Sequence, residues 1–214
     1  MTKSTLIAAA LAAGLLALHA GPAAAQSKWG PGADDATFQA MLKSSFKDNG
    51  IAKTARLTQD ETQAFCSTPD NATDPAAAKK REAIEAANLA TVKWPSDGKW
   101  LGDWKEGEKI AQSGRGLTWT DKAEQVNGGN CYNCHQITAE EISHGTIGPS
   151  LHNYGKLRDR DEATLKATWV RIYNSKSVNA CSNMPRGGHM GIIDETQIKH
   201  LMALLLDPQS PVNK

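Results

Sequence analysis

Two cysteines and a histidine lie close together in the middle of the chain, as Cys131, Cys134 and His135 in the run CYNCH. Two thiols at this spacing can each add across a vinyl group of haem, and the adjacent histidine is then carried beneath the ring to ligate the iron. The other interpretations are a thioredoxin-like redox pair and half of a zinc site. The first needs a βαβ pattern and the second a further pair of ligands, and the sequence has neither. The motif therefore predicts one covalently attached haem c.

The sixth ligand of such an iron would come from a distant part of the chain. Met184 precedes Pro185 in an irregular stretch before the last expected helix, and a thioether there would give His/Met ligation with a raised reduction potential. Position alone leaves competitors open, and these are Met190, His189, His144 and His152. With both axial positions filled, the iron would relay electrons and be protected from oxygen and peroxide.

A proline stands where it could orient His135. Pro149 lies in the segment GTIGPSL, and its carbonyl could accept a hydrogen bond from the His135 ring nitrogen that does not bind iron. That bond would fix the tautomer and strengthen the ligand. We therefore expect a cofactor site of Cys131, Cys134, His135, Pro149 and Met184, with His135 and Met184 as the metal ligands and no residue acting as a nucleophile.

The elements that must position these residues are expected to be helices, because no segment of the sequence has a strand pattern. The expected helices lie between Asp35 and Asn49, from Thr58 past Cys66, from Asp74 to Trp94, from Asp103 to Ser113, from Asp159 to Tyr173 and from Asp194 to Pro208. Several begin with the spacing of a capping box: Thr58 with Glu61, Asp103 with Glu106, Asp159 with Glu162, and Asp194 with Gln197.

Two features of these helices concern packing. Gly107 weakens its helix by roughly 1 kcal/mol, so we expect it to permit a close helix crossing. The last helix should bury an apolar stripe made of Ile198, Leu201, Met202 and Leu205.

The beginning of the chain has the pattern of a secretory signal peptide. Lys3 is followed by an apolar run from Leu6 to Leu18, and residues 23 to 25 are all alanine. We expect residues 1–25 to be removed by cleavage after Ala25, with export to an oxidising compartment such as a bacterial periplasm. No later apolar segment approaches transmembrane length, so no membrane insertion is expected.

Charge and length bound the possible partners and domains. The sequence has 24 Lys and Arg against 23 Asp and Glu, and the leader holds one base, Lys3, and no acid, which leaves 23 of each. A balanced charge gives no reason to expect nucleic acid or anionic lipid as a partner. We expect a helical N-terminal extension at residues 26–99 and a haem domain at residues 100–214. The thin apolar faces of the extension could pack on the haem domain or on another protein.

Two cysteines remain, Cys66 and Cys181. In an oxidising compartment such a pair most simply forms a disulfide. This bond would join the extension to the loop that delivers Met184. A reactive thiol or a metal ligand is the alternative.

Several segments together resemble a known family. The CYNCH motif, the GTIGPSL segment, the TWVRIYN helix and the ending MPRGGHMGIIDETQIKHLMALL look like class I cytochromes c over about residues 100–206. The pairing of IGPSL with NMPR behind a long N-terminal region is similar to SoxX, the monohaem subunit of the SoxAX complex of thiosulfate oxidation. In that family the methionine before proline binds iron, which favours Met184.

The resemblance implies a place in sulfur oxidation. Coupling thiosulfate to a protein cysteine releases two electrons, and a single haem accepts one at a time, so this chain would not complete the reaction alone. A SoxA-like haem subunit would hold the catalytic site of a heteromeric L-cysteine S-thiosulfotransferase, and a carrier protein would present the cysteine. This chain would pass electrons to a downstream cytochrome c. The alternatives are a free-standing periplasmic electron shuttle, and a ligand binder or peroxidase with a displaceable sixth ligand.

Overall fold

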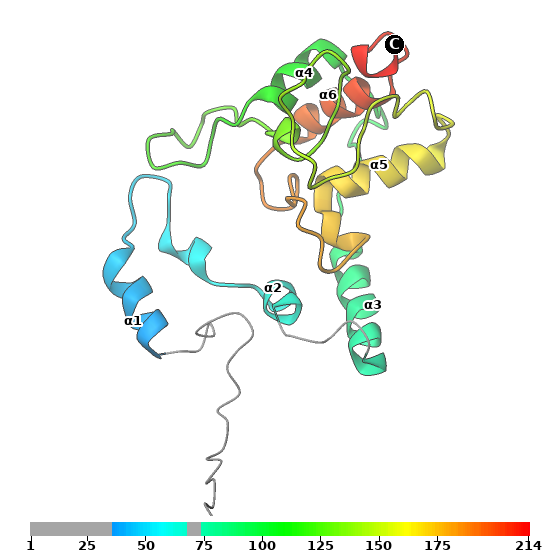
Figure 1. The fold of residues 1–214 in the computed structure, drawn as a ribbon. Helices are drawn as coiled ribbons and strands as arrows, with labels where there is room; N and C mark the ends of the chain where they lie inside the picture. The colour runs from blue at the N-terminus through cyan, green and yellow to red at the C-terminus, as the bar shows by residue number, and fades with distance from the viewer. Residues whose placement is uncertain (1–35, 68–73) are drawn as a thin grey trace, which may run out of the picture. The chain divides into compact units, whose positions relative to one another are not determined.

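The computed structural model describes residues 36–67 and 74–214, and within them it is built from helices and loops (Figure 1). The elements in chain order are α1 (Ala36–Ser45), η1 (Thr54–Leu57), α2 (Glu61–Cys66), α3 (Pro75–Ala90), α4 (Trp104–Gln112), η2 (Cys131–Asn133), α5 (Glu162–Asn174), η3 (Ser175–Ser177), α6 (Glu195–Leu206) and η4 (Pro211–Asn213), where η marks a 3₁₀ helix. The described residues form no strand, only an isolated bridge between Asn49 and Ala52. The expected all-α fold is therefore confirmed for this part of the chain. The expected signal peptide lies outside the described residues.

The chain consists of two compact units, residues 1–43 and residues 44–214. Helix α1 begins at Ala36, within the expected range of residues 35–49, and buries none of its residues. The second unit holds the remaining elements and the hydrophobic core. Residues 44–99 of the expected extension therefore belong to the same compact unit as the expected haem domain.

The core of the second unit is centred on α6, which crosses α4 closely (Figure 1). Ile198, Leu201, Met202 and Leu205 are all buried, as the apolar stripe predicts. A Cβ atom on Gly107 would collide with the backbone carbonyl of His200 and would come within 2.9 Å of the Cβ of Leu204. The expected close crossing at Gly107 is thus confirmed.

Helix α5 packs beside this pair through a row of tryptophans. The Trp169 side chain is 1% exposed, and its ring stacks edge-on against Trp100, with ring centroids 5.7 Å apart. Trp100 meets Trp94 in the same manner at 5.9 Å, and the Trp169 indole donates a hydrogen bond to the carbonyl of Lys93 at 2.8 Å. These contacts fasten the segment between α3 and α4 to the core.

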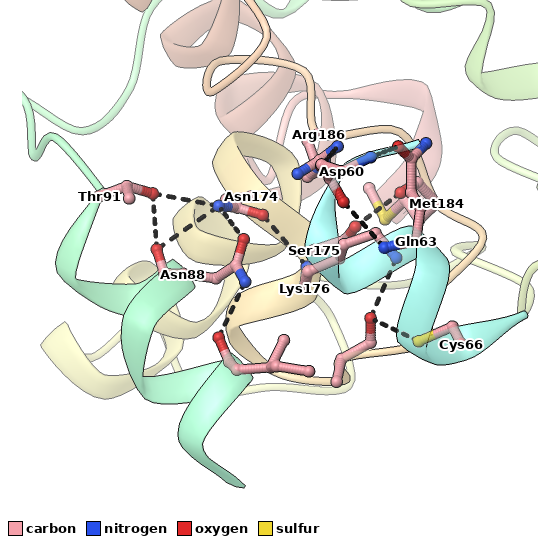
Figure 2. A network of polar contacts seen from close by, with 12 residues as sticks. Asp60, Gln63, Cys66, Asn88, Thr91, Asn174, Ser175, Lys176, Met184 and Arg186 are labelled. Carbon is pink, nitrogen blue, oxygen red and sulfur yellow. Dashed lines mark hydrogen bonds and ion pairs between the residues drawn. The ribbon is translucent and has the colours of Figure 1, made fainter. Parts of the chain in front are cut away.

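The extension packs on its own chain through α3. Ala77, Ile84 and Asn88 are buried, and α3 contacts both α5 and η3. The Asn174 side-chain amide donates to the Asn88 side-chain oxygen at 3.0 Å and to the Thr91 hydroxyl at 3.1 Å, as Figure 2 shows. Of the two alternatives left open by the sequence, packing on the parent domain is the one found for α3.

Helix boundaries confirm some of the expected caps and correct others. Asp74 caps α3 in front of Pro75, and Asp194 caps α6 in a full capping box with Gln197, both as expected. Thr58 was the wrong choice for α2, because Thr58 ends η1 and the capping box is formed by Asp60 with Gln63.

Three further helix ends differ from the prediction. Helix α5 is capped by Asp161, whose carboxylate accepts from the backbone of Thr164, and not by Asp159. Asp103 does cap α4, but the returning bond to the Glu106 side chain is missing, because the Asp103 N–H donates instead to His200 Nδ1 at 2.8 Å. Helix α3 ends at Ala90, before the expected Trp94, since the Thr91 N–H and hydroxyl both turn back to the carbonyl of Asn88.

Residues 113–161, between α4 and α5, contain the CYNCH motif and only one short helical turn, η2. The end of this segment is fastened to the C-terminal tail. Asn213 accepts hydrogen bonds from the backbone of Gly155 at 2.8 Å and Lys156 at 3.1 Å, and Asn153 donates to the carbonyl of Val212 at 2.7 Å. Ser210, Val212 and Asn213 of the tail are buried, which the sequence pattern did not indicate.

Candidate haem-attachment site

A tight turn brings the three residues of the CYNCH motif together. Asn130 takes the left-handed conformation at φ 51° and directs the chain into η2. The carbonyl of Cys131 then accepts from the backbone N–H of Cys134 at 3.1 Å and of His135 at 2.9 Å. One helical turn therefore carries both thiols and the imidazole, and neither thiol is in a disulfide.

The ring of His135 is buried and oriented by one hydrogen bond. Its Nδ1 atom lies 2.7 Å from the carbonyl oxygen of Pro149. The bond predicted between these residues is confirmed. Because the Pro149 carbonyl can only accept, Nδ1 carries the proton and Nε2 has its lone pair available for a metal.

Gly148 keeps this orientation by leaving room for the ring. A Cβ atom at Gly148 would collide with the imidazole of His135. The backbone N–H of Gly148 also donates to the carbonyl of Cys134 at 2.8 Å. The GTIGPSL segment is therefore bonded to the motif both at the backbone of Cys134 and at the His135 ring. A glycine is therefore required at position 148 by close approach and not by its backbone angles.

A buried polar group lies behind the cysteines. The Tyr132 hydroxyl donates to Glu108 Oε1 at 2.8 Å and lies 3.1 Å from the Thr138 hydroxyl, so α4 is bonded to η2. Burial, followed by its carboxylate partner, raises the pKa of Tyr132. Burial also raises the pKa of the Cys131 thiol to about 12. A thiol with that pKa is neutral at physiological pH, which disfavours a reactive thiolate of the thioredoxin type.

Met184 lies in the methionine loop, which we define as residues 178–193 between η3 and α6. Its side chain is half-buried and packs against the same hydrophobic core as Cys131 and Leu151. Its backbone is held at both ends. The Ser175 hydroxyl donates to the Met184 carbonyl at 2.6 Å, as Figure 2 shows. The Met184 N–H donates to the Ser182 hydroxyl at 3.2 Å.

The four competing ligands have different surroundings. Met190 is 56% exposed, and the His144 Nδ1 atom lies 3.2 Å from the carbonyl of its neighbour, Gly145. The His152 Nδ1 atom is buried without a hydrogen-bond partner. Burial and the nearby Arg186 guanidinium lower the pKa of His189. Among these residues only Met184 has both a core-facing thioether and a backbone fixed by side chains.

The disulfide expected between Cys66 and Cys181 is present. It joins the end of α2 to the methionine loop, three residues before Met184. A second link, which the sequence analysis missed, is the ion pair of Asp60 and Arg186 at 2.5 Å (Figure 2). Arg186 keeps only 10% of its side chain exposed. No local pattern signals a pair whose members lie 126 residues apart.

The Asp60–Arg186 pair makes stability depend on pH. Burial of Asp60 raises its pKa, but the Gln63 N–H and the Arg186 guanidinium outweigh burial, and the pKa falls below its ordinary value of 3.8. A lowered folded-state pKa stabilises the fold above pH 3.8, and this stabilisation is lost as the pH falls through the folded-state value. We expect the free energy of unfolding, measured in urea from about pH 5 to pH 2.5, to fall less steeply in Asp60→Asn than in the wild type. Parallel curves would contradict this.

No three His, Cys, Asp or Glu residues come together as a metal site in residues 36–67 and 74–214. No helix in the described ranges is long and apolar enough to span a membrane. A cavity of about 250 Å³ lies between α5 and the start of α6, lined by Trp169, Tyr173 and Ile198 among others, and none of the predicted cofactor residues lines it.

The fold and the site define an all-helical protein whose C-x-x-C-H turn carries an oriented histidine. No protein-family model matches the chain. The chain is 34% identical to a protein of Aquifex aeolicus strain VF5 described as an uncharacterized lipoprotein, and the alignment covers all of both sequences. The chain belongs to the family of that protein.

Proposed function

We propose that this protein is an exported monohaem cytochrome c of the SoxX type, the electron-relay subunit of a sulfur-oxidising complex. The observation that carries the proposal is the hydrogen bond from His135 Nδ1 to the Pro149 carbonyl directly beside the Cys131–Cys134 pair. It gives the histidine the tautomer and orientation of a metal ligand. In the sequence, this histidine directly follows the two cysteines, which form no disulfide.

The residues present fit haem c. Cys131 and Cys134 would form the two thioethers, and His135 and Met184 would be the axial ligands. Pro149 holds the His135 ring, and Ser175 and Ser182 hold the backbone of Met184. Bound haem c would supply one-electron transfer at a potential raised by the thioether ligand. The class I cytochrome c fold is part of the same proposal, supported by the α4–α6 crossing and by the order of motif, Gly-Pro segment, α5, methionine loop and α6.

Three observations support export. The sequence begins with a signal-peptide pattern, and the Aquifex relative is described as a lipoprotein, a class of exported proteins. The disulfide of Cys66 and Cys181 fits an oxidising compartment such as the periplasm. We carry over export from this relative and not lipid attachment.

The partners follow from the electron count. Thiosulfate coupling to a carrier cysteine releases two electrons, so a one-electron site needs a second centre and an acceptor. We propose a SoxA-like haem subunit as the heterodimer partner, a carrier protein that presents the cysteine, and a downstream cytochrome c as acceptor. The catalytic site would lie on the partner subunit, and this chain would contribute no catalytic residue.

Native purification tests this function. The haem-absorbing fraction would be isolated from the periplasm of the source organism, and every chain in it identified by mass spectrometry. A second haem protein in stoichiometric amount would support the complex. A lone monohaem monomer that exchanges electrons with other cytochromes would contradict it and leave the free-standing shuttle.

Gly148 gives a prediction for the histidine. Gly148→Ala places a methyl group against the His135 ring, so the ring must rotate and lose its bond to Pro149. We expect the share of purified protein that carries covalent haem to fall severalfold. Absorbance of the alkaline pyridine complex, divided by protein concentration, measures this share. Gly191→Ala is the control for backbone strain alone, because Gly191 has a φ of 65° and no atom lies within 4 Å of a Cβ there, so an alanine strains the backbone without touching the His135 ring. Unchanged haem content in Gly148→Ala would contradict the account.

A further inference from the structure

Helix α2 is attached to the methionine loop by two bonds of different chemistry. The Cys66–Cys181 disulfide joins the last residue of α2 to the loop, and the Asp60–Arg186 ion pair joins the capping residue of α2 to the loop at a second point. Met184 lies between the two loop residues in the sequence. Figure 2 shows α2 beside this part of the loop.

The part of the loop next to Cys181 is also bonded to α3 and η3. The Ala180 N–H donates to the Glu85 carboxylate of α3 at 3.0 Å, and the buried Lys176 ammonium donates to the Ala180 carbonyl at 3.0 Å. Burial and the neighbouring Arg186 both lower the pKa of Lys176. Residues 180 to 186 are therefore held by α2, α3 and η3, and not by the core alone.

The disulfide is the bond in this arrangement that chemistry can open without unfolding the protein. Cys66 and Cys181 are each only partly buried, so a small thiol can approach them. Opening the bond therefore leaves α2 held to the loop by Asp60 and Arg186.

We propose that α2 positions Met184 for ligation and that thiol–disulfide exchange at Cys66–Cys181 releases this control. The sixth-ligand part rests on the proposed function, while the hold of α2 on the loop does not. In the exchange, a dithiol reductant gives two electrons and two protons to the disulfide. The Cys66–Cys181 bond breaks, two thiols form on this chain, and the reductant closes its own disulfide. Asp60 and Arg186 are then positioning residues that act through the loop backbone.

The test uses the full-length holoprotein with and without dithiothreitol, with free thiols counted after each treatment. Amide hydrogen exchange of residues 180–186 reports the loop, and the methionine-to-iron charge-transfer band of the oxidised protein reports the sixth ligand. We expect reduction to speed exchange in this segment on the order of tenfold or more, because a disulfide closing so long a chain segment restrains it strongly. The freed thiols are then alkylated, dithiothreitol is removed and the haem iron is reoxidised with ferricyanide, after which the charge-transfer band should be weaker than in the untreated protein.

Three variants distinguish the effects of the disulfide and of the Asp60–Arg186 ion pair from a general destabilisation of α2. Cys66→Ser with Cys181→Ser should show the fast exchange without reductant and no further response to it. Asp60→Asn should speed exchange in the oxidised protein by a smaller factor. Glu61→Gln is the matched control, since it removes an exposed pair of α2 with Lys80 at 2.7 Å that does not touch the loop, and it should change neither signal.

Two results would overturn the inference. If two new thiols appear on reduction while exchange and the charge-transfer band stay unchanged, α2 does not control the loop. If Glu61→Gln speeds exchange as much as Asp60→Asn, the effect is a general loosening of α2. A chain without haem whose exchange still responds to reductant would instead contradict the proposed function and support the hold of α2 on the loop.

Discussion

Replacing Met184 by alanine is expected to leave haem covalently attached while lowering its reduction potential and opening the iron to carbon monoxide. The thioether faces the core on a loop whose backbone is bonded to Ser175 and Ser182. Under the proposed ligation, its removal would leave the sixth position without a protein ligand. Axial ligands set haem potentials over a range of about 0.8 V, and we expect a decrease on the order of 0.1 V or more. Potentiometric titration and the carbon monoxide spectrum of the reduced protein measure both effects.

Met190→Ala is the matched control for this experiment. Met190 is in the same loop but is 56% exposed, and its removal should change neither the potential nor the binding of carbon monoxide. If Met184→Ala keeps the wild-type spectrum while Met190→Ala loses it, Met190 is the ligand. If neither variant changes, the ligand is a histidine.

Replacing Gly107 by valine is expected to have the largest effect on stability. The new side chain would collide with the His200 carbonyl and the Leu204 side chain at the α4–α6 crossing, where backbone and core residues cannot yield easily. We expect a loss of about 3 kcal/mol or more in the free energy of unfolding, at the upper end for overpacked cores. Urea unfolding followed by circular dichroism measures it.

Glu106→Ala is the control for this second prediction. Glu106 is on the same helix, and its pair with Lys109 is exposed on both sides. Exposed pairs contribute roughly 0 to 1 kcal/mol, so the variant should unfold close to the wild type. An equal loss in both variants would show that α4 is sensitive to any change and that the crossing at Gly107 is not special.

Local signals predicted those helices whose caps have no close competitor. Asp194 and Gln197 form a capping box before an apolar stripe, and Asp74 stands before a proline, so both starts were correct. At α5 two aspartates lie two residues apart, and no local pattern favours Asp161 over Asp159 as the cap. The choice depends on which backbone N–H groups the fold leaves free.

The candidate site likewise combines features that the local sequence predicted with features that depend on tertiary contact. The CYNCH turn and the Pro149 bond are encoded within a short stretch, and the disulfide could be inferred by pairing the two remaining cysteines. The ion pair of Asp60 and Arg186 and the bond from Ser175 to Met184 depend on tertiary contact. Charged residues such as Asp60 are common on helix starts, so nothing in the sequence distinguishes one that reaches a partner 126 residues away.

The measurement that tests the central claim most directly is covalent haem content. The full chain would be exported in a bacterial host with cytochrome c maturation, then denatured and fully reduced before gel electrophoresis and haem staining. The account predicts haem on the chain, lost in Cys131→Ala with Cys134→Ala and retained in Cys66→Ser with Cys181→Ser. A colourless wild-type chain whose Cys131 and Cys134 both react as free thiols would contradict it.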